Sequence, residues 1–475
     1  MSRIRIVGGT ITKTSKGATT IEVLDGHFKS NAAKENRWVG EEKGNTYHEY
    51  KAPEKKVDEK KEAIKEIECL TTLDFGSTND KADGVNNPGM IFGKTYHFRV
   101  KSYLKDVPKN KLEIKWLLKY HNLSENKWEE IPLSVKGDSV KITMNEKNMC
   151  GRFIYVRAYV KDHATEAELK IWKHNRFRWF NRLKIHQQIK DRAKDPWKIS
   201  QEYSSLCGMA ALYYAMIKRD PKAYENLAKE LFRTGGYKVG AYVVKPHEKA
   251  LGMYETKPTD SNYKSMGMHE IDWIVLATTR SGESLNSQFV YNGFENGDMD
   301  MLKAVNWPDM LTRMCKEVAG YANAESFGLN LYSIMNKKGI EAKAHDYVSN
   351  SDLLELKKID IKYNAGHNIL MMIDSNMIED VSGYNPINLS TNSHWVVYEG
   401  GLTFYDIHGN ITTKVDQAEK VFFSIYTWGL DFKNDYLPES GNKKEVNPKY
   451  KFLYKPYYID IKTFKSNYYG FIEVF

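Results

Sequence analysis

The chain has 475 residues and a formal net charge of +9 at pH 7, and this length predicts two or three domains. Hydrophobic residues make up 41% of it and charged residues 28%, which is the composition of a folded protein and excludes a disordered chain. No apolar run approaches the roughly 18 residues of a membrane-spanning helix, so we expect no integral membrane segment.

Residues 1–70 predict a short β-rich segment followed by a charged linker. Apolar and polar residues alternate around glycines in RIRIVGGTITKT, as in short strands, and the run KAPEKKVDEKKEAIKEIECL is typical of a solvated linker. The N-terminus is basic but has no continuous apolar region, so we expect no cleaved signal peptide. We expect a cytoplasmic location in the producing cell, and any export would bypass the general secretory route.

Residues 88–163 predict a small β-sandwich of immunoglobulin-like size. Runs such as YHFRVKSY, LEIKWLLKY and RFIYVRAYV alternate with period two and are separated by turn-rich breaks. Trp116 lies in one of these runs, and such sandwiches bury a tryptophan there. No cysteine pair is placed to join the two sheets, and nothing in the block suggests chemistry. We therefore expect this domain to bind a partner or to act as a spacer.

Residues 164–195 interleave basic and aromatic residues, reading KIWKHNRFRWFNRLKIHQQIKDRAK over most of their length. The pattern favours an amphipathic helical linker whose Lys and Arg side chains are solvated. The alternative is a contact of Arg176, Arg178 and Arg182 with nucleic acid or an anionic surface. We favour the linker, since a charge run alone has little specificity.

Residues 196–475 predict an α+β domain in which helices come first and an antiparallel sheet follows. The stretch MHEIDWIVLATTRSGE holds His269, Glu270 and Asp272, but without the HExxH spacing of a zinc helix, so we expect packing rather than a metal site. The glycines of RTGGYKVGAYVVKP do not match a phosphate-binding loop and indicate a hairpin. No cofactor or metal is expected. Helical spacing marks residues 205–219, 221–233 and 308–321, and strand patterns mark 368–374, 394–400, 402–409 and 422–429.

Cys207 is the candidate nucleophile. It stands where the polar loop QEYSSL gives way to an apolar helical run, with Ser204 and Ser205 available as helix caps. A thiol at a helix N-terminus feels the positive end of the helix dipole, which favours the thiolate and lowers the pKa. With no CxxC pair, all four cysteines are expected to be reduced. The other three are interpreted as structural: Cys69, Cys150 and Cys315.

His394 is the candidate base and Asp406 its partner. His394 begins the strand HWVVYEGG, and Asp406 follows a glycine turn in FYDIHG. Two adjacent antiparallel strands would bring Asp406 beside the imidazole, where it could fix the tautomer and stabilise the imidazolium. Three other histidines are rivals for the role of base. They are His408, His345 and, as the strongest, His367, which occupies a similar strand start.

With these residues in this order, the C-terminal part resembles the papain-like cysteine peptidases. Gln201 lies six residues before Cys207, the spacing at which that family places its oxyanion-hole glutamine. The resemblance implies a papain-like fold in which the Gln201 side chain and the Cys207 backbone N–H receive the oxyanion. Asp406 stands where many members have Asn. The Cys-Gly-Ser-Cys-Trp motif of plant and lysosomal members is missing, so the chain is more similar to the bacterial effector and toxin branch.

The N-terminal half is similar in strand pattern to Bacteroidota effectors of the type VI secretion system, in which a β-rich start and a sandwich precede a variable toxin domain. This resemblance implies injection into target cells without a signal peptide, loading onto the tube or spike of the apparatus, and a cognate immunity protein. The predicted function is an antibacterial toxin with papain-like cysteine protease activity on a protein or peptide substrate. The alternatives are a peptidoglycan amide hydrolase of the NlpC type and a catalytically inactive module that binds nucleic acid or a membrane.

Overall fold

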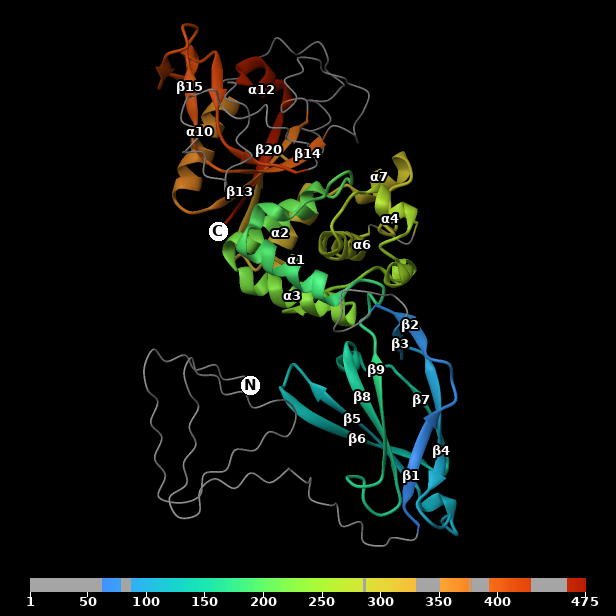
Figure 1. Ribbon diagram of the computed structural model, residues 1–475. Coiled ribbons are helices and arrows are strands. Elements are labelled where there is room, and N and C mark those ends of the chain that lie inside the picture. The colour runs from blue at the N-terminus through green and yellow to red at the C-terminus, as the bar shows by residue number, and fades with distance from the viewer. Residues whose placement is uncertain are drawn as a thin grey trace, which may run out of the picture. The chain divides into compact units, whose positions relative to one another are not determined.

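The computed structural model describes residues 62–77, 87–284, 288–329, 351–375, 377, 393–428 and 459–475. The strands predicted near the N-terminus, and most of the charged linker after them, lie outside these residues. All described residues belong to one unit of the chain, Lys60–Phe475. Within it strands come first and a mixture of helices and antiparallel sheets follows (Figure 1), which confirms the α+β class.

The first part of the described chain consists of two antiparallel sheets that share one core. The strand order is β1-β4-β7 in one sheet and β6-β5-β8-β9 in the other, and two short strands, β2 and β3, form a separate hairpin. The strands are β1 Ile64–Cys69, β2 Asp74–Gly76, β3 Asn87–Gly89, β4 Thr95–Tyr103, β5 Lys115–Asn122, β6 Lys127–Lys136, β7 Ser139–Thr143, β8 Arg152–Tyr159 and β9 Ala167–Lys173, with 3-10 turns η1 Lys111–Glu113 and η2 Lys147–Met149.

Because apolar and polar residues alternate in these strands, the apolar side chains lie on one face of each sheet and form the shared core. In β4 most side chains are alternately buried and exposed, so one face of the strand is apolar, and Tyr96 and Phe98 pack in the same cluster as Trp116 of β5. Trp116 is fully buried, as predicted, and its indole N–H donates to the carbonyl of Gly137 at 2.8 Å. β1 and β9 extend the sandwich on both sides of the predicted range, 88–163.

The prediction of a helix over residues 164–195 is wrong for the first half of that range. β9 continues to Lys173 because it pairs with β8 along its whole length, and this pairing overrides the helical spacing of the sequence. The helix α1 (Arg182–Lys194) begins only after Asn181, whose side-chain oxygen accepts a hydrogen bond from the Lys184 N–H at 3.1 Å.

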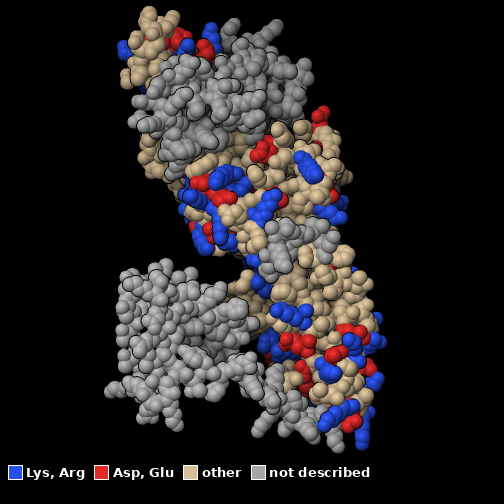
Figure 2. Space-filling model, in the orientation of Figure 1, with Lys and Arg blue, Asp and Glu red and all other residues tan. Residues whose placement is uncertain are grey.

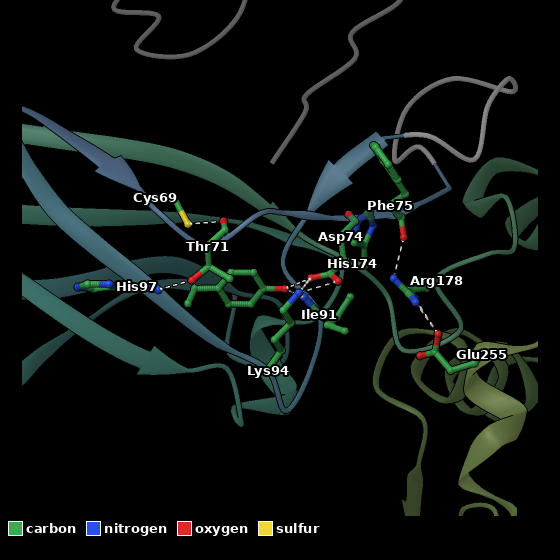
Figure 3. A network of polar contacts seen from close by, with 11 residues as sticks. Cys69, Thr71, Asp74, Phe75, Ile91, Lys94, His97, His174, Arg178 and Glu255 are labelled. Carbon is green, nitrogen blue, oxygen red and sulfur yellow. Dashed lines mark hydrogen bonds and ion pairs between the residues drawn. The ribbon is translucent and has the colours of Figure 1, made fainter.

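The arginines between β9 and α1 contact both the β-sheets that precede them and the helices that follow them. Arg178 donates to the carbonyl of Phe75 at 2.8 Å and to the carboxylate of Glu255 at 2.6 Å (Figure 3). The guanidinium of Arg176 lies 4.1 Å from the ring centre of Tyr254, a cation–π contact. Because these two side chains are used inside the protein, they do not form the free cationic surface that nucleic-acid binding requires.

The helices that follow are mostly buried in one core. The predicted helices α2 (Cys207–Arg219), α3 (Pro221–Thr234) and α8 (Pro308–Glu317) are confirmed, as is the hairpin β10–β11. The remaining elements of this part are η3 Pro196–Lys198, β10 Tyr237–Val239, β11 Tyr242–Val244, η4 Glu248–Glu255, α4 Ser261–Ser265, α5 Glu270–Asp272, the π-helical turn η5 Trp273–Ala277, α6 Thr278–Gly282 and α7 Asp298–Ala304.

Two antiparallel sheets complete the described chain. The larger has the order β12-β20-β13-β14-β18 and the smaller has the order β16-β15-β17-β19. Their strands are β12 Ala324–Phe327, β13 Asn368–Asp374, β14 Ser393–Tyr398, β15 Thr403–Tyr405, β16 Ile411–Thr412, β17 Lys420–Phe422, β18 Ile425–Tyr426, β19 Ile459–Asp460 and β20 Tyr468–Val474, accompanied by α10 Ser351–Asn364, η8 Val415–Gln417 and α12 Ile461–Asn467.

The larger sheet separates two hydrophobic cores. Trp395 and Val397 of β14 pack in the cluster that contains α2, whereas Val396 and Tyr398 pack in the cluster that contains the smaller sheet. This alternation follows from the two-residue repeat of a strand. On the face drawn in Figure 2, Lys and Arg side chains lie intermixed with Asp and Glu. None of the helices in the described ranges combines the length and apolarity that crossing a membrane requires.

Candidate functional site

The helix α2 carries Cys207 at its N-terminus and lies against β14, the strand that contains His394. Gly208 makes the close approach possible: a Cβ atom at this position would lie 2.5 Å from Cβ of Asn306 and 3.1 Å from Cδ1 of Trp395. Trp395 is fixed in turn, since its indole N–H donates to the carbonyl of Asn306 at 3.0 Å. The start of α2 therefore lies against β14 at Trp395, the residue that follows His394.

Cys207 is buried, with only 7% of the residue exposed. Burial raises its pKa to about 11, and the backbone N–H groups of Trp395 and Gly208, which are directed at the sulfur, oppose this rise only in part. The expectation of a lowered pKa is therefore wrong, because the loss of hydration outweighs the helix terminus. At neutral pH the resting form is the thiol.

The loop before Cys207 is held differently from the prediction. The N-cap residue of α2 is Leu206, and no side chain caps the helix. Ser204 instead donates its hydroxyl to the carbonyl of Gln201 at 2.7 Å. Ser205 donates both its N–H and its hydroxyl to the carboxylate of Glu295. The two serines thus shape the turn and do not cap the helix.

His394 stands at the start of β14, as predicted, and its ring is oriented by Thr427. Nε2 lies 2.7 Å from the Thr427 hydroxyl, and the ring centre lies 6.3 Å from that of Trp428. Burial lowers the pKa of His394 to about 4, so the imidazole is neutral at physiological pH. Within the described part of the chain, no hydrogen bond joins this imidazole to the Cys207 thiol, and the group of β14 directed at the sulfur is the N–H of Trp395, the residue after His394.

Gln201 is buried in the same loop. Its Nε2 donates to the carbonyl of Ser204 at 2.6 Å, which occupies one of the two N–H groups of the amide. Its Oε1 is buried without a hydrogen-bond partner among the described residues, and so is Oδ1 of Asn306. Unpaired buried oxygens are costly, and both are on residues that hydrogen-bond to the loop before Cys207. Such a pair calls for an explanation, of which a role in binding or catalysis is one.

Asp406 does not lie beside His394, and this prediction is wrong in its geometry. β14 pairs with β13 and β18, whereas β15, which precedes Asp406, pairs with β16 and β17 in the other sheet. The Asp406 carboxylate accepts the N–H groups of His408 at 2.9 Å and Asn410 at 2.8 Å. These bonds lower the pKa of this solvent-exposed carboxylate, which closes its own turn.

The rival histidines that the structure describes, His367 and His408, do not lie at the contact of α2 with β14. His367 precedes β13 and binds Glu473 through Nδ1 at 2.6 Å. In the pairing of β13 with β14, residue 369 faces Tyr398, so His367 lies at the end of β14 remote from His394. His408 is exposed in the turn of Asp406, and His345 lies outside the described residues.

A groove of about 660 Å³ runs along the side of the His394–Thr427 pair. Its lining includes Thr427 and Trp428 from beyond β18 and Ser200 and Glu202 from either side of Gln201. Neither Cys207 nor His394 is part of the lining, so in this structure the groove does not open onto the thiol.

A buried ion pair anchors the Gln201 loop. Arg192 of α1 binds Asp272 through two hydrogen bonds of 2.5 Å, and both side chains are almost fully buried. Oδ2 of Asp272, which also accepts from Arg192, accepts the Ser200 N–H at 3.3 Å, and Tyr426 donates to the carbonyl of Ile199 at 2.8 Å. Here Asp272 packs and pairs, as expected, and the described residues contain no group of three or more potential metal ligands.

Sequence reasoning missed Thr427, Glu295 and Asn306. Only Thr427 left a trace in the sequence, as the polar residue of IYTWG in a run that otherwise reads as a buried strand. The other two reach the site from loops distant in the chain. Comparison with known proteins adds no further assignment: no family model, no curated protein and no solved structure matches this chain.

Proposed function

We propose that the C-terminal part of the chain is a papain-like cysteine hydrolase of amide bonds, with Cys207 as nucleophile and His394 as base. The observation that carries the proposal is the helix–strand contact: the N-terminus of the buried helix α2 brings Cys207 against the strand that His394 begins. Cys315 is equally buried within a helix, but burial alone acts on it and raises its pKa to about 12. No backbone N–H group is directed at that sulfur in the way found for Cys207.

The proposal requires the tautomer of His394 in which Nε2 carries the proton, and the contact of Nε2 with the Thr427 hydroxyl is compatible with it. If Nε2–H donates to the Thr427 hydroxyl, the lone pair is on Nδ1. In the proposed reaction Nδ1 takes the thiol proton as the sulfur bonds to the carbonyl carbon, and then returns it to the leaving amine as the C–N bond breaks. Water attacks the resulting thioester with the same base, which releases the acid and restores the thiol.

Because the pKa of Cys207 is raised and that of His394 is lowered, the pair rests as a neutral thiol and a neutral imidazole. The base therefore acts when substrate is bound, and no thiolate–imidazolium pair is formed in advance. The developing oxyanion would be received by the Cys207 backbone N–H and the second N–H of the Gln201 amide. Asp406 has no part in this mechanism.

The delivery part of the proposal rests on the N-terminal half. We infer an antibacterial effector in which the two β-sheets before α1, proposed as an immunoglobulin-like domain, serve delivery or partner binding. Injection by a type VI secretion apparatus, contact with its tube or spike, and a cognate immunity protein belong to the same proposal. The substrate is a protein or peptide.

A thiol-directed inactivator tests the enzyme assignment. Because Cys207 rests as a buried thiol, the inactivator is a peptide-linked electrophile that binds as a substrate does. Its selective reaction with Cys207, followed by loss of toxicity in Cys207→Ala, supports the assignment, whereas reaction at Cys207 no faster than at the other three cysteines contradicts it. Expression of the wild type in the cytoplasm or the periplasm of target cells then identifies the substrate class. If toxicity were confined to the periplasm and muropeptides were altered, the proposed activity would change from a protease to a peptidoglycan amidase of the NlpC type.

A further inference from the structure

A second cavity of about 370 Å³ lies away from Cys207, between β8 and β9 of the sandwich and the helices α1 and α3. Cationic side chains line it from three of these elements, namely Arg152, Arg182, Lys229 and Arg233. Glu230 is the one carboxylate in the lining, and it is held by Arg233 through bonds of 2.7 and 2.8 Å. The volume lies in the range of pockets that bind small molecules.

Arg152 is the residue in this pocket that most needs a partner. Its one hydrogen bond goes to the neighbouring carbonyl of Gly151 at 3.3 Å, and its Nε and Nη2 are buried without a partner among the described residues. Burial and then the charge of Arg233 lower its pKa to about 10. A guanidinium in this state has unused donors arranged as a fork, which matches the oxygens of a phosphate or carboxylate.

Trp172 adds a second unused donor to the same pocket. Its indole Nε1 is buried and has no acceptor among the described residues. The pKa of His186, also in the lining, is lowered to about 4 by burial and then by Arg182 and Lys229. The buried polar atoms that lack a partner here are therefore donors, and the local potential is positive.

Apolar rings stand at the mouth of the pocket. Trp128 is 52% exposed and Phe153 is 37% exposed, and both belong to the lining. An indole and a phenyl ring exposed next to unpaired cationic donors suit a ligand that has a planar ring as well as an anionic group.

We propose that this pocket binds a phosphate ester that carries a planar aromatic ring, with its phosphate on Arg152 and Trp172 and its ring against Trp128 and Phe153. The inference is independent of the proposed hydrolase, since no residue of the Cys207 site lines the pocket.

Calorimetric titration of the full-length protein with AMP, inorganic phosphate and adenosine tests this assignment. We expect AMP to bind more tightly than either fragment, and the fluorescence of Trp128 and Trp172 to change on binding. Arg152→Gln should weaken AMP and phosphate about tenfold or more. Trp128→Ala, at a position that is 52% exposed, should weaken the binding of AMP and leave that of phosphate unchanged.

Arg157→Gln is the matched control, because Arg157 lies on the same strand but pairs with Glu168 at 2.5 Å outside the pocket. It should leave AMP binding within about twofold of the wild type. Equal losses in Arg152→Gln and Arg157→Gln, no binding of AMP or phosphate at millimolar concentration, or AMP no tighter than phosphate would each overturn the proposal. So would an acidic peptide that occupies the pocket and is not displaced by AMP.

Discussion

The contact between α2 and β14 and the turn after β15 both place polar side chains at the end of a strand, but water reaches only one of them. At the first, Cys207, Gln201 and Thr427 are buried, and the pKa values of Cys207 and His394 are shifted by burial. At the second, Asp406 is partly exposed and its carboxylate is used within the turn.

The difference shows what separates chemistry from local structure in this molecule. Buried polar groups that lack full hydrogen bonding raise the free energy of the folded state, and such groups lie on Gln201 and Asn306 beside Cys207. An exposed carboxylate that accepts two N–H groups needs no function beyond stabilising its turn. The predictions below test whether the two regions behave in this way.

The largest effect is expected from removing the nucleophile. Cys207→Ala should reduce hydrolysis of pooled fluorogenic peptide amides by about a thousandfold or more, because no other group forms the acyl intermediate. Cys315→Ala is the matched control, since both thiols are buried in helices, and it should keep wild-type activity. Equal activity of the two variants would remove Cys207 from the mechanism.

Breaking the ion pair beneath the site should come next. Arg192→Met leaves the Asp272 carboxylate buried without its counter-ion, and we expect the free energy of unfolding in urea to fall by about 3–5 kcal/mol. Lys184→Met removes the pair of Lys184 with Glu270, in which the lysine is 60% exposed. In that control the free energy of unfolding should fall by about 1 kcal/mol or less. A similar loss in both variants would show that the buried pair is no special anchor.

The pH dependence of alkylation tests the burial of the thiol. With the pKa of Cys207 raised to about 11, the thiolate fraction grows about tenfold per pH unit below that value. The rate of Cys207 modification by iodoacetamide, followed by mass spectrometry, should therefore keep rising between pH 7 and 10. In urea-unfolded protein the rate should level off near the ordinary value of 9.0. A flat, fast rate at pH 7 would instead indicate a preformed thiolate.

Part of this arrangement could be predicted from the sequence. Cys207, His394 and the helices and strands that carry them follow from local spacing, and α2, α3 and β13 begin or end within about two residues of the predicted bounds. The pairing of strands could not be predicted in the same way. His394 and Asp406 are close in sequence, but β14 takes β18 as its neighbour, and that choice depends on which faces the cores bury. The prediction of a lowered pKa for Cys207 failed for a related reason. Burial raises that pKa, and burial depends on how the whole structure packs.

Removing the hydroxyl of Thr427 should slow hydrolysis less than removing the nucleophile does. Thr427→Val keeps the shape of the buried side chain but removes the hydrogen bond that orients His394, so we expect hydrolysis to slow about threefold to tenfold. Alkylation of Cys207 at pH 7 should be unchanged, because the thiol does not depend on this bond at rest. A Thr427→Ser variant retains the hydroxyl and should recover most of the rate. If valine and serine act alike, Thr427 only fills space.

Asp406→Asn should have the smallest effect, and it gives the comparison its strictest test. Asparagine can accept the N–H groups of His408 and Asn410 through its side-chain oxygen, so the turn should be kept and hydrolysis should stay within about twofold of the wild type. If Asp406 oriented His394, the loss of its charge would instead slow hydrolysis by orders of magnitude. Such a loss in a variant with unchanged thermal stability would mean that the strands rearrange when substrate binds, and the exposed turn would then belong to the active site.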